Sequence, residues 1–169
     1  MVSKDVKKAI KGDKDKLANC ILEIQNSLYR VSYGILNNEE DAKDAISNTI
    51  IKVYENISSL KNAEFFKTWI TRILINECNN IIRKNSKYVE CEEIEKVKTD
   101  EINILSIAVR DIINKLGNDF KNIVILYYFD DYSVKEISKI LDISTGTVKS
   151  RLSRARDELK RLNIKNLKD

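Results

Sequence analysis

The sequence contains no histidine and no proline, and it has only four glycines among its 169 residues. With so few helix breakers, almost the whole chain is free to form helix. Without histidine the chain lacks the usual general base and the commonest side-chain ligand of transition metals. There is also no glycine-rich phosphate loop and no nucleophile elbow. We therefore predict that the protein is not an enzyme and uses no cofactor or metal.

Cysteines and long apolar runs are scarce as well. Cys20, Cys78 and Cys91 are far apart and form no CxxC pair, which argues against a zinc site or a disulfide framework. Cys20 and Cys78 fall within helical patterns, so we expect both to be small buried side chains. No apolar run approaches the length of a membrane span, and the first residues lack the apolar core of a signal peptide. We therefore expect a cytoplasmic protein.

Apolar residues recur at intervals of three and four along most of the chain, as in amphipathic helices. The pattern predicts helices at about 2–36, interrupted near Gly12, and at about 39–57, and another that starts near 64. Residues 85–103 have mixed charge and no stable period, and so long a stretch is unusual inside a compact domain. We predict an all-α protein with two small helical domains, at 1–86 and 104–169, joined by a flexible linker at 87–103.

Two of the four helices expected in the C-terminal domain form a helix-turn-helix. Ser133 is a good N-cap, and Glu136 stands three residues later, which is the spacing of a capping box. Asp142 stands where the first helix must end, and aspartate tolerates the left-handed backbone required there. Ser144 caps a second and longer helix. The short turn between the two helices completes the motif.

The second helix of this motif has one narrow apolar stripe and an outer face of small, hydroxyl and cationic side chains. Small and hydroxyl residues permit close approach to a groove, and cations match phosphates or guanine edges. A solvated basic helix is the alternative, but caps, turn and stripe together favour the reading of duplex DNA. The candidate DNA-binding residues are Ser144, Thr145, Thr147, Lys149, Ser150, Arg151, Ser153 and Arg154.

Two earlier helices have polar faces of contrasting character. Positions 37–56 hold five acids and two lysines, so that helix has an acidic face, either simply solvated or suited to a basic protein partner. Positions 61–88 hold six cations and two acids, with a stripe of arginines and amides beside an aromatic cluster. Such a stripe is able to hold unpaired bases, although an ordinary amphipathic helix with aromatic core residues has the same pattern.

Two long stretches resemble the extracytoplasmic-function (ECF) group of bacterial sigma-70-type factors. The stretch YSVKEISKILDISTGTVKSRLSRARDELKRL is similar to the C-terminal promoter-recognition domain of that group. The segments DAKDAISNTIIKVYENI and FFKTWITRILINECNNIIRKNSK are similar to its N-terminal domain. The resemblance covers essentially the whole chain. It implies a sigma factor that binds core RNA polymerase and directs promoter-specific initiation. A stand-alone helix-turn-helix regulator is the alternative, and an adaptor that binds polymerase without reading promoters is another.

The resemblance also implies roles for individual residues in the N-terminal domain. The acidic helix matches the segment that docks on the clamp helices of the largest polymerase subunit, through Asp41, Asp44, Ser47, Asn48 and Lys52. Family members often have Gln-Glu where this chain has Ser47-Asn48, which puts the polymerase contact at those two positions in question. The next segment matches the one that captures a flipped base of the minus-ten element and contacts the adjoining DNA. The implied residues there are Lys61, Asn62, Ala63, Glu64, Trp69, Arg72, Asn76, Asn79, Asn80, Arg83 and Lys84, with Trp69 equally consistent with a core position.

For the C-terminal domain, the resemblance implies that the exposed face of the second helix of the motif reads the minus-thirty-five element. The implied partners are promoter DNA and core RNA polymerase, through the clamp helices of its largest subunit and the flap of its second subunit. A cognate anti-sigma factor, often membrane-anchored, is implied as well, and it would hold the otherwise cytoplasmic chain at the membrane. No small-molecule substrate is expected, because the polymerase supplies the catalytic chemistry.

Overall fold

The computed structural model describes residues 2–88 and 107–161, and within these ranges the structure is helical and contains no strand. The N-terminal domain contains α1 (Val2–Ile10), α2 (Lys14–Leu36), α3 (Glu39–Asn56) and α4 (Phe66–Tyr88). The C-terminal domain contains α5 (Ile107–Asn114), α6 (Asn118–Val124), α7 (Val134–Leu141) and α8 (Thr145–Arg161). The prediction of an all-α fold with two helical domains is confirmed. The predicted linker lies outside the described residues, except for its first two positions.

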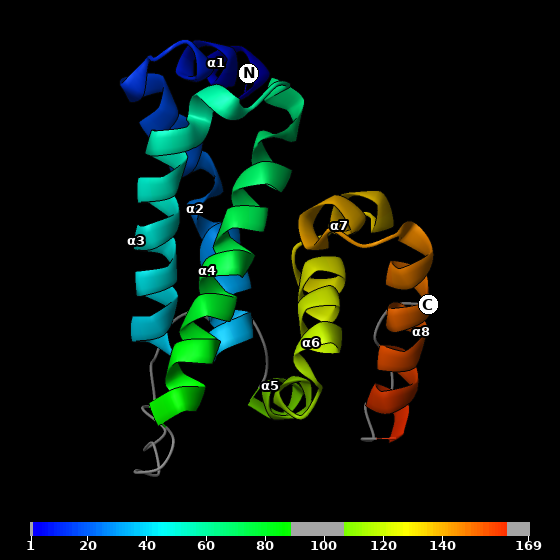
Figure 1. Cartoon of the computed structure of the whole chain (residues 1–169). Helices are drawn as coiled ribbons and strands as arrows, with labels where there is room; N and C mark the ends of the chain where they lie inside the picture. The colour runs from blue at the N-terminus through cyan, green and yellow to red at the C-terminus, as the bar shows by residue number, and fades with distance from the viewer. Residues whose placement is uncertain (1, 89–106, 162–169) are drawn as a thin grey trace.

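The N-terminal domain is built from three long helices, α2, α3 and α4, with α1 lying across one end of them (Figure 1). Gly12 has a φ of 106°, a backbone that glycine adopts readily, and it separates α1 from α2. Asn37 ends α2 with a left-handed backbone, and Asn38 begins α3 by accepting the amide of Asp41 at 2.9 Å. The interruption near Gly12 and the break after position 36 therefore occur where the sequence predicts them.

The helix-turn-helix forms as its local signals predict. Ser133 Oγ accepts the amide of Glu136 at 3.2 Å, and the Glu136 carboxylate accepts the amide of Ser133 at 2.8 Å, which completes the capping box. Asp142 ends α7 with φ 56° and ψ 46°, and Ser144 Oγ accepts the amide of Thr147 at 3.0 Å where α8 begins. The buried stripe that includes Val148 and Leu152 packs α8 onto α6 and α7.

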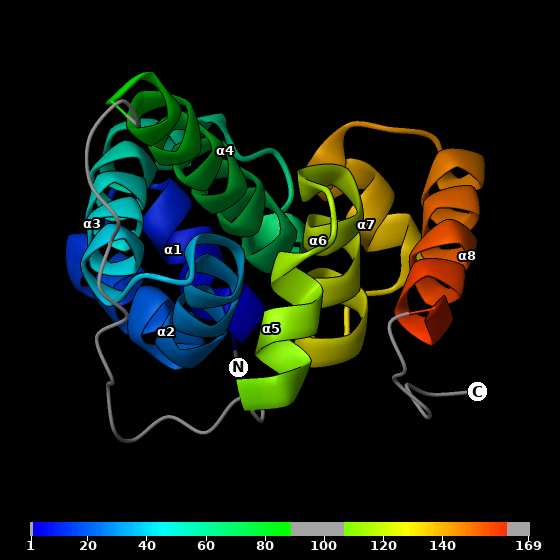
Figure 2. The same ribbon diagram turned by 90° about the horizontal axis from the view of Figure 1, so that it is seen from below.

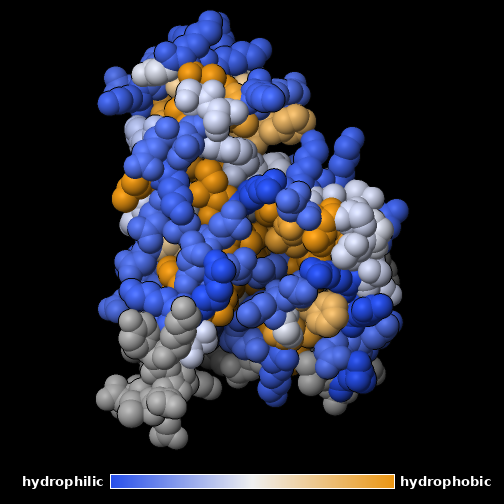
Figure 3. All heavy atoms as spheres, in the orientation of Figure 1, coloured by the Kyte–Doolittle hydropathy of each residue, from blue (hydrophilic) through white to orange (hydrophobic). Residues whose placement is uncertain are grey.

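The two domains pack against each other and share one continuous hydrophobic core. Fully buried side chains come from both, such as Phe66 and Leu74 of α4 and Ile137 of α7. Figure 2 shows α5 and α6 against the N-terminal helices, with α8 on the far side of the C-terminal domain. On the face drawn in Figure 3 hydrophilic residues predominate, and apolar residues gather along its middle, over α4 and beside the C-terminal helices.

The core is tightly packed around Gly34, and it encloses two cysteine side chains. A Cβ atom at Gly34 of α2 would lie 3.1 Å from Ile125 Cδ1 in η3 (Ile125–Phe129), a π-helical turn that follows α6. Cys20 and Cys78 are buried free thiols, as the sequence predicts, and burial raises the pKa of Cys78 to about 12.

None of the helices in the described part of the chain combines the length and apolar character that a bilayer span requires.

Candidate nucleic-acid interface

The outer face of α8 points away from the rest of the molecule, at the edge of the C-terminal domain (Figures 1 and 2). Helical spacing and burial bring the predicted small, hydroxyl and cationic side chains onto this face. Those exposed are Ser144, Thr145, Lys149, Ser150, Ser153 and Arg154, and Thr147 is half-buried beside them. A convex helix face of this chemistry has the shape and hydrogen-bonding groups to enter a major groove.

Arg151 is the predicted α8 residue with a different orientation. Its Nη2 atom lies 2.8 Å from Asp119 Oδ2 of α6, and its side chain is largely covered. Arg151 therefore holds α8 against α6 in this structure and is not part of the exposed face.

The predicted base-capture loop, residues 61–64, leads into α4 through a capped turn. Asn62 Oδ1 accepts the amide of Glu64 at 3.0 Å and begins η2 (Ala63–Phe65), a 3-10 turn. Lys61, Asn62 and Glu64 are exposed, whereas the methyl group of Ala63 is buried. The loop thus offers three polar side chains to a ligand and uses Ala63 to anchor itself in the core.

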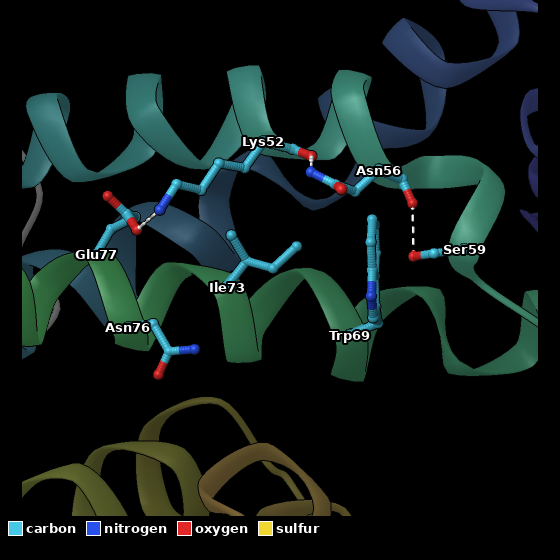
Figure 4. A pocket seen from close by; sticks show the side chains of 7 residues that line it. All are labelled: Lys52, Asn56, Ser59, Trp69, Ile73, Asn76 and Glu77. Carbon is cyan, nitrogen blue, oxygen red and sulfur yellow. Dashed lines mark hydrogen bonds and ion pairs between the residues drawn. The ribbon is translucent and has the colours of Figure 1, made fainter.

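A pocket of about 290 Å³ lies between α3 and α4 (Figure 4). It extends to Ser59 of η1 (Ile57–Ser59), a 3-10 turn just before the loop at 61–64. Its lining consists of Lys52, Asn56, Ser59, Trp69, Ile73, Asn76 and Glu77. Trp69 is half-buried, and its ring centroid is 6.4 Å from that of Phe66. The indole therefore belongs both to the edge of the core and to the wall of the pocket. An aromatic wall with nearby amides suits the stacking and edge recognition of a base.

An ion pair closes one end of this pocket. Lys52 Nζ of α3 lies 2.5 Å from Glu77 Oε1 of α4, and Glu77 is buried (Figure 4). Glu77 also accepts a hydrogen bond from Asn80 Nδ2 at 3.3 Å. The structure thus directs Lys52, a predicted polymerase contact, into the pocket.

Sequence reasoning missed Asn56, Ser59 and Glu77 as pocket residues. Glu77 had a usable signal, because it is an acid at helical spacing between the apolar positions Ile73 and Ile81. Asn56 and Ser59 had none, since polar residues at the end of a helix are ordinary.

The predicted α4 stripe does not form a single site. Asn76 lines the pocket, Arg72 pairs with Asp142 of the helix-turn-helix at 3.2 Å, and Arg83 donates to Asn80 Oδ1 at 2.5 Å. Arg72, Asn76, Asn80, Arg83 and Lys84 are exposed, and Asn79 is half-buried. The stripe therefore has three separate parts along α4. One lies at the pocket, one at the turn of the helix-turn-helix, and one at the C-terminal end of α4.

The predicted polymerase residues on α3, apart from Lys52, lie outside the pocket lining. Asp44, Ser47 and Asn48 are exposed, and Asp41 is half-buried and accepts Asn85 Nδ2 at 3.1 Å. Asp41, Asp44 and Asn48 follow helical spacing and share one face. That face combines acidic and small polar groups, a composition suited to a basic or polar protein surface.

Comparison with known proteins accounts for both domains. Residues 20–88 match the family model for Sigma-70 region 2, and residues 106–159 match that for Sigma-70, region 4. These matches place the fold in the sigma-70 class. The chain is 30% identical to the ECF RNA polymerase sigma factor SigW of Bacillus subtilis, over 95% of this chain and 96% of SigW. It is also 30% identical to the sigma factor SigV of the same organism, over 82% of this chain and 86% of SigV. The chain therefore belongs to the ECF RNA polymerase sigma factors.

Two solved structures have the same fold. CnrH, in complex with the cytosolic domain of CnrY, matches with a TM-score of 0.74 at 17% identity, over 95% of this chain and 96% of CnrH. The sigma factor RpoE of Bartonella quintana, in complex with the anti-sigma factor NepR, matches with a TM-score of 0.75 at 24% identity. That match covers 86% of this chain and 95% of RpoE.

Proposed function

We propose that this sigma factor reads the minus-thirty-five element with α8 and holds unpaired bases of the minus-ten element at α4 when it is bound to core RNA polymerase. The observation that supports this most is the presence of two different DNA-type surfaces on one chain. The α8 face is convex and suits duplex DNA, whereas the α3–α4 pocket is concave, with an aromatic wall that suits a single base. The working units are the predicted domains 1–86 and 104–169.

At the upstream element, Lys149 and Arg154 would reach base edges and phosphates, while Ser150 and Ser153 would permit close approach. At the downstream element, unstacking a base costs a few kcal/mol, and contacts in the pocket offset this cost when the base fits. Trp69 would stack on the base, and Asn76 with the 61–64 loop would contact its edge. The polymerase supplies the catalysis, and this chain supplies the choice of promoter.

Protein partners complete the proposal. The acidic α3 face would dock on the clamp helices of the largest polymerase subunit, and the C-terminal domain would meet the flap of the second subunit. CnrH was solved with the cytosolic domain of CnrY, and RpoE was solved with the anti-sigma factor NepR. We include a cognate, membrane-anchored anti-sigma factor among the partners, and with it a cytoplasmic location.

The α3 assignment is tested by the affinity of the full chain for purified core polymerase. Asp44→Asn removes one exposed charge from the proposed contact face, and we expect affinity to fall by ~0.5–1 kcal/mol, with a smaller loss at high salt. Glu23→Gln is the matched control, since it removes the same charge from an exposed position on α2. Equal effects of the two substitutions would remove Asp44 from the interface. Tight binding of duplex DNA by a dimer that does not bind core polymerase would instead indicate a stand-alone regulator.

A further inference from the structure

Lysines are concentrated in α1 and in the turn that follows it. Residues 4–16 contain six lysines and three aspartates. Three of these lysines are exposed and follow helical spacing, so they share one side of α1 and of the turn after it: Lys4, Lys8 and Lys11. These three side chains form the α1 lysine row. Figure 3 shows hydrophilic side chains over this end of the molecule.

The nearby aspartates do not neutralise the row. Asp5 lies 3.4 Å from Lys16 Nζ, and Asp13 Oδ1 accepts the amide of Lys16 at 3.0 Å, where it caps α2. Asp15 stands in the first turn of α2, where a carboxylate favours the helix dipole. In residues 2–88 and 107–161, the α1 lysine row forms no ion pair with a carboxylate. The row is therefore a local concentration of positive charge that is available to an anionic ligand.

Helix α1 lies directly beside the base-capture loop, residues 61–64. Val6 and Ala9 of α1 are buried in the same core as Leu60 and Ala63. The helix contacts both η1 and η2, the two 3-10 turns between α3 and α4. In Figure 1, α1 lies across the end of the bundle at which the chain passes from α3 to α4. Because helical spacing places the lysine row opposite Val6 and Ala9, the row faces outward next to the loop.

We propose that the α1 lysine row binds backbone phosphates of the same unpaired DNA strand whose base enters the α3–α4 pocket. This inference rests on the proposed function, because it extends the minus-ten surface from the pocket and the loop onto α1. Surfaces that bind single-stranded nucleic acid combine a site where a base stacks with cations that follow the backbone. The pocket supplies Trp69 for stacking, and the row supplies the cations.

The strand has a short path from the pocket to the row. Ser59 of η1 lines the pocket, Lys61 is exposed in the loop, and α1 contacts η1 and η2 beside them. Lys4 and Lys11 are seven residues apart, or about 10 Å along a helix. One strand of duplex DNA carries a phosphate about every 3.4 Å, so the row faces roughly two or three phosphates. Ammonium groups bind phosphates without reading bases, so α1 adds affinity for the open strand and leaves its sequence to the pocket.

The salt dependence of DNA binding by the full-length protein tests the proposal. The probe is a short fluorescein-labelled oligothymidine, and fluorescence anisotropy gives its affinity at several salt concentrations. Each phosphate contact with a single strand adds about 0.7 to the slope of log affinity against log salt concentration. We expect Lys4→Gln/Lys8→Gln to reduce this slope by ~1.4 and to weaken binding at low salt. Glutamine has a helix propensity close to that of lysine, and circular dichroism checks that the variant remains helical.

Lys115→Gln/Lys160→Gln is the matched control. It removes the same charge from two exposed positions of the C-terminal domain, one just after α5 and one in the last turn of α8. We expect this control to leave the slope unchanged. An equal loss of slope in both variants would mean that net charge alone matters, and it would overturn the proposal. A native chain whose affinity for oligothymidine does not depend on salt would overturn it as well.

Affinity for core RNA polymerase distinguishes a DNA surface from a protein interface. We expect Lys4→Gln/Lys8→Gln to bind core polymerase as the native chain does. A loss of that affinity with an unchanged slope for oligothymidine would assign the row to the polymerase and overturn the proposal. Because the oligothymidine measurement needs neither polymerase nor promoter, a reduced slope supports the row even if run-off transcription fails. Promoter-specific transcription combined with an unchanged slope would reject the row alone.

Discussion

An Ile137→Ala substitution is expected to lower the free energy of unfolding by ~2–5 kcal/mol, the range for removing a large aliphatic side chain from a packed core. Ile137 is fully buried in α7 and belongs to the core that both domains share. Alanine has a higher helix propensity than isoleucine, so the helix itself is not weakened by the substitution. The loss of stability comes from the lost apolar burial and from the cavity left behind. Since small proteins are stable by only about 5–15 kcal/mol, this is a substantial fraction of the total.

Urea denaturation followed by circular dichroism measures this loss. Ile51→Ala is the control, because Ile51 is on α3 with 56% of its surface exposed and should change stability by less than about 0.5 kcal/mol. If Ile137→Ala lowers the free energy of unfolding no more than Ile51→Ala does, Ile137 does not pack in the shared core as described.

Arg154→Ala is expected to weaken discrimination among upstream-element variants by ~1–3 kcal/mol, the range for one good contact between arginine and a base. Arg154 is exposed on the outer face of α8, so its loss leaves the buried stripe unchanged. The affinity of the polymerase complex for promoters that differ at single upstream base pairs gives this quantity directly.

Arg161→Ala is the matched control for Arg154→Ala. Arg161 is also an exposed arginine of α8, but it lies in the last turn and pairs with Glu158 at 2.6 Å. We expect it to weaken binding slightly and equally for all promoter variants, as a phosphate contact or a solvated charge would. A preference profile that Arg154→Ala leaves intact would exclude Arg154 from sequence reading.

Local sequence signals were sufficient to predict most of the fold. The breaks at Gly12 and Asn37, the capping box at Ser133 and the left-handed Asp142 each depend on residues close together in the chain. Such signals predict where helices begin and end, and apolar spacing predicts which face is buried. They do not predict how two finished domains meet. The bond from Ser27 to Asp130 joins residues 103 positions apart, and no periodic pattern marks either partner.

The candidate sites were predictable in part, for the same reason. Helical spacing brings the α8 residues together, and the structure exposes them as predicted, apart from the half-buried Thr147 and Arg151, which pairs with Asp119. The pocket depends on how α3 and α4 pack, so its complete lining could not be read from either helix alone. Lys52 shows this most clearly, because spacing groups it with the acidic face, whereas its ammonium group reaches across to Glu77.

Promoter-specific initiation is the central claim, and run-off transcription with purified core RNA polymerase on a set of genomic promoter fragments tests it most directly. We expect core polymerase alone to give no defined transcripts, and the native chain to add discrete run-off products from a subset of fragments. Arg154→Ala should change the relative yields within that subset. A chain that binds core polymerase but gives no promoter-dependent transcript on any fragment would contradict the claim.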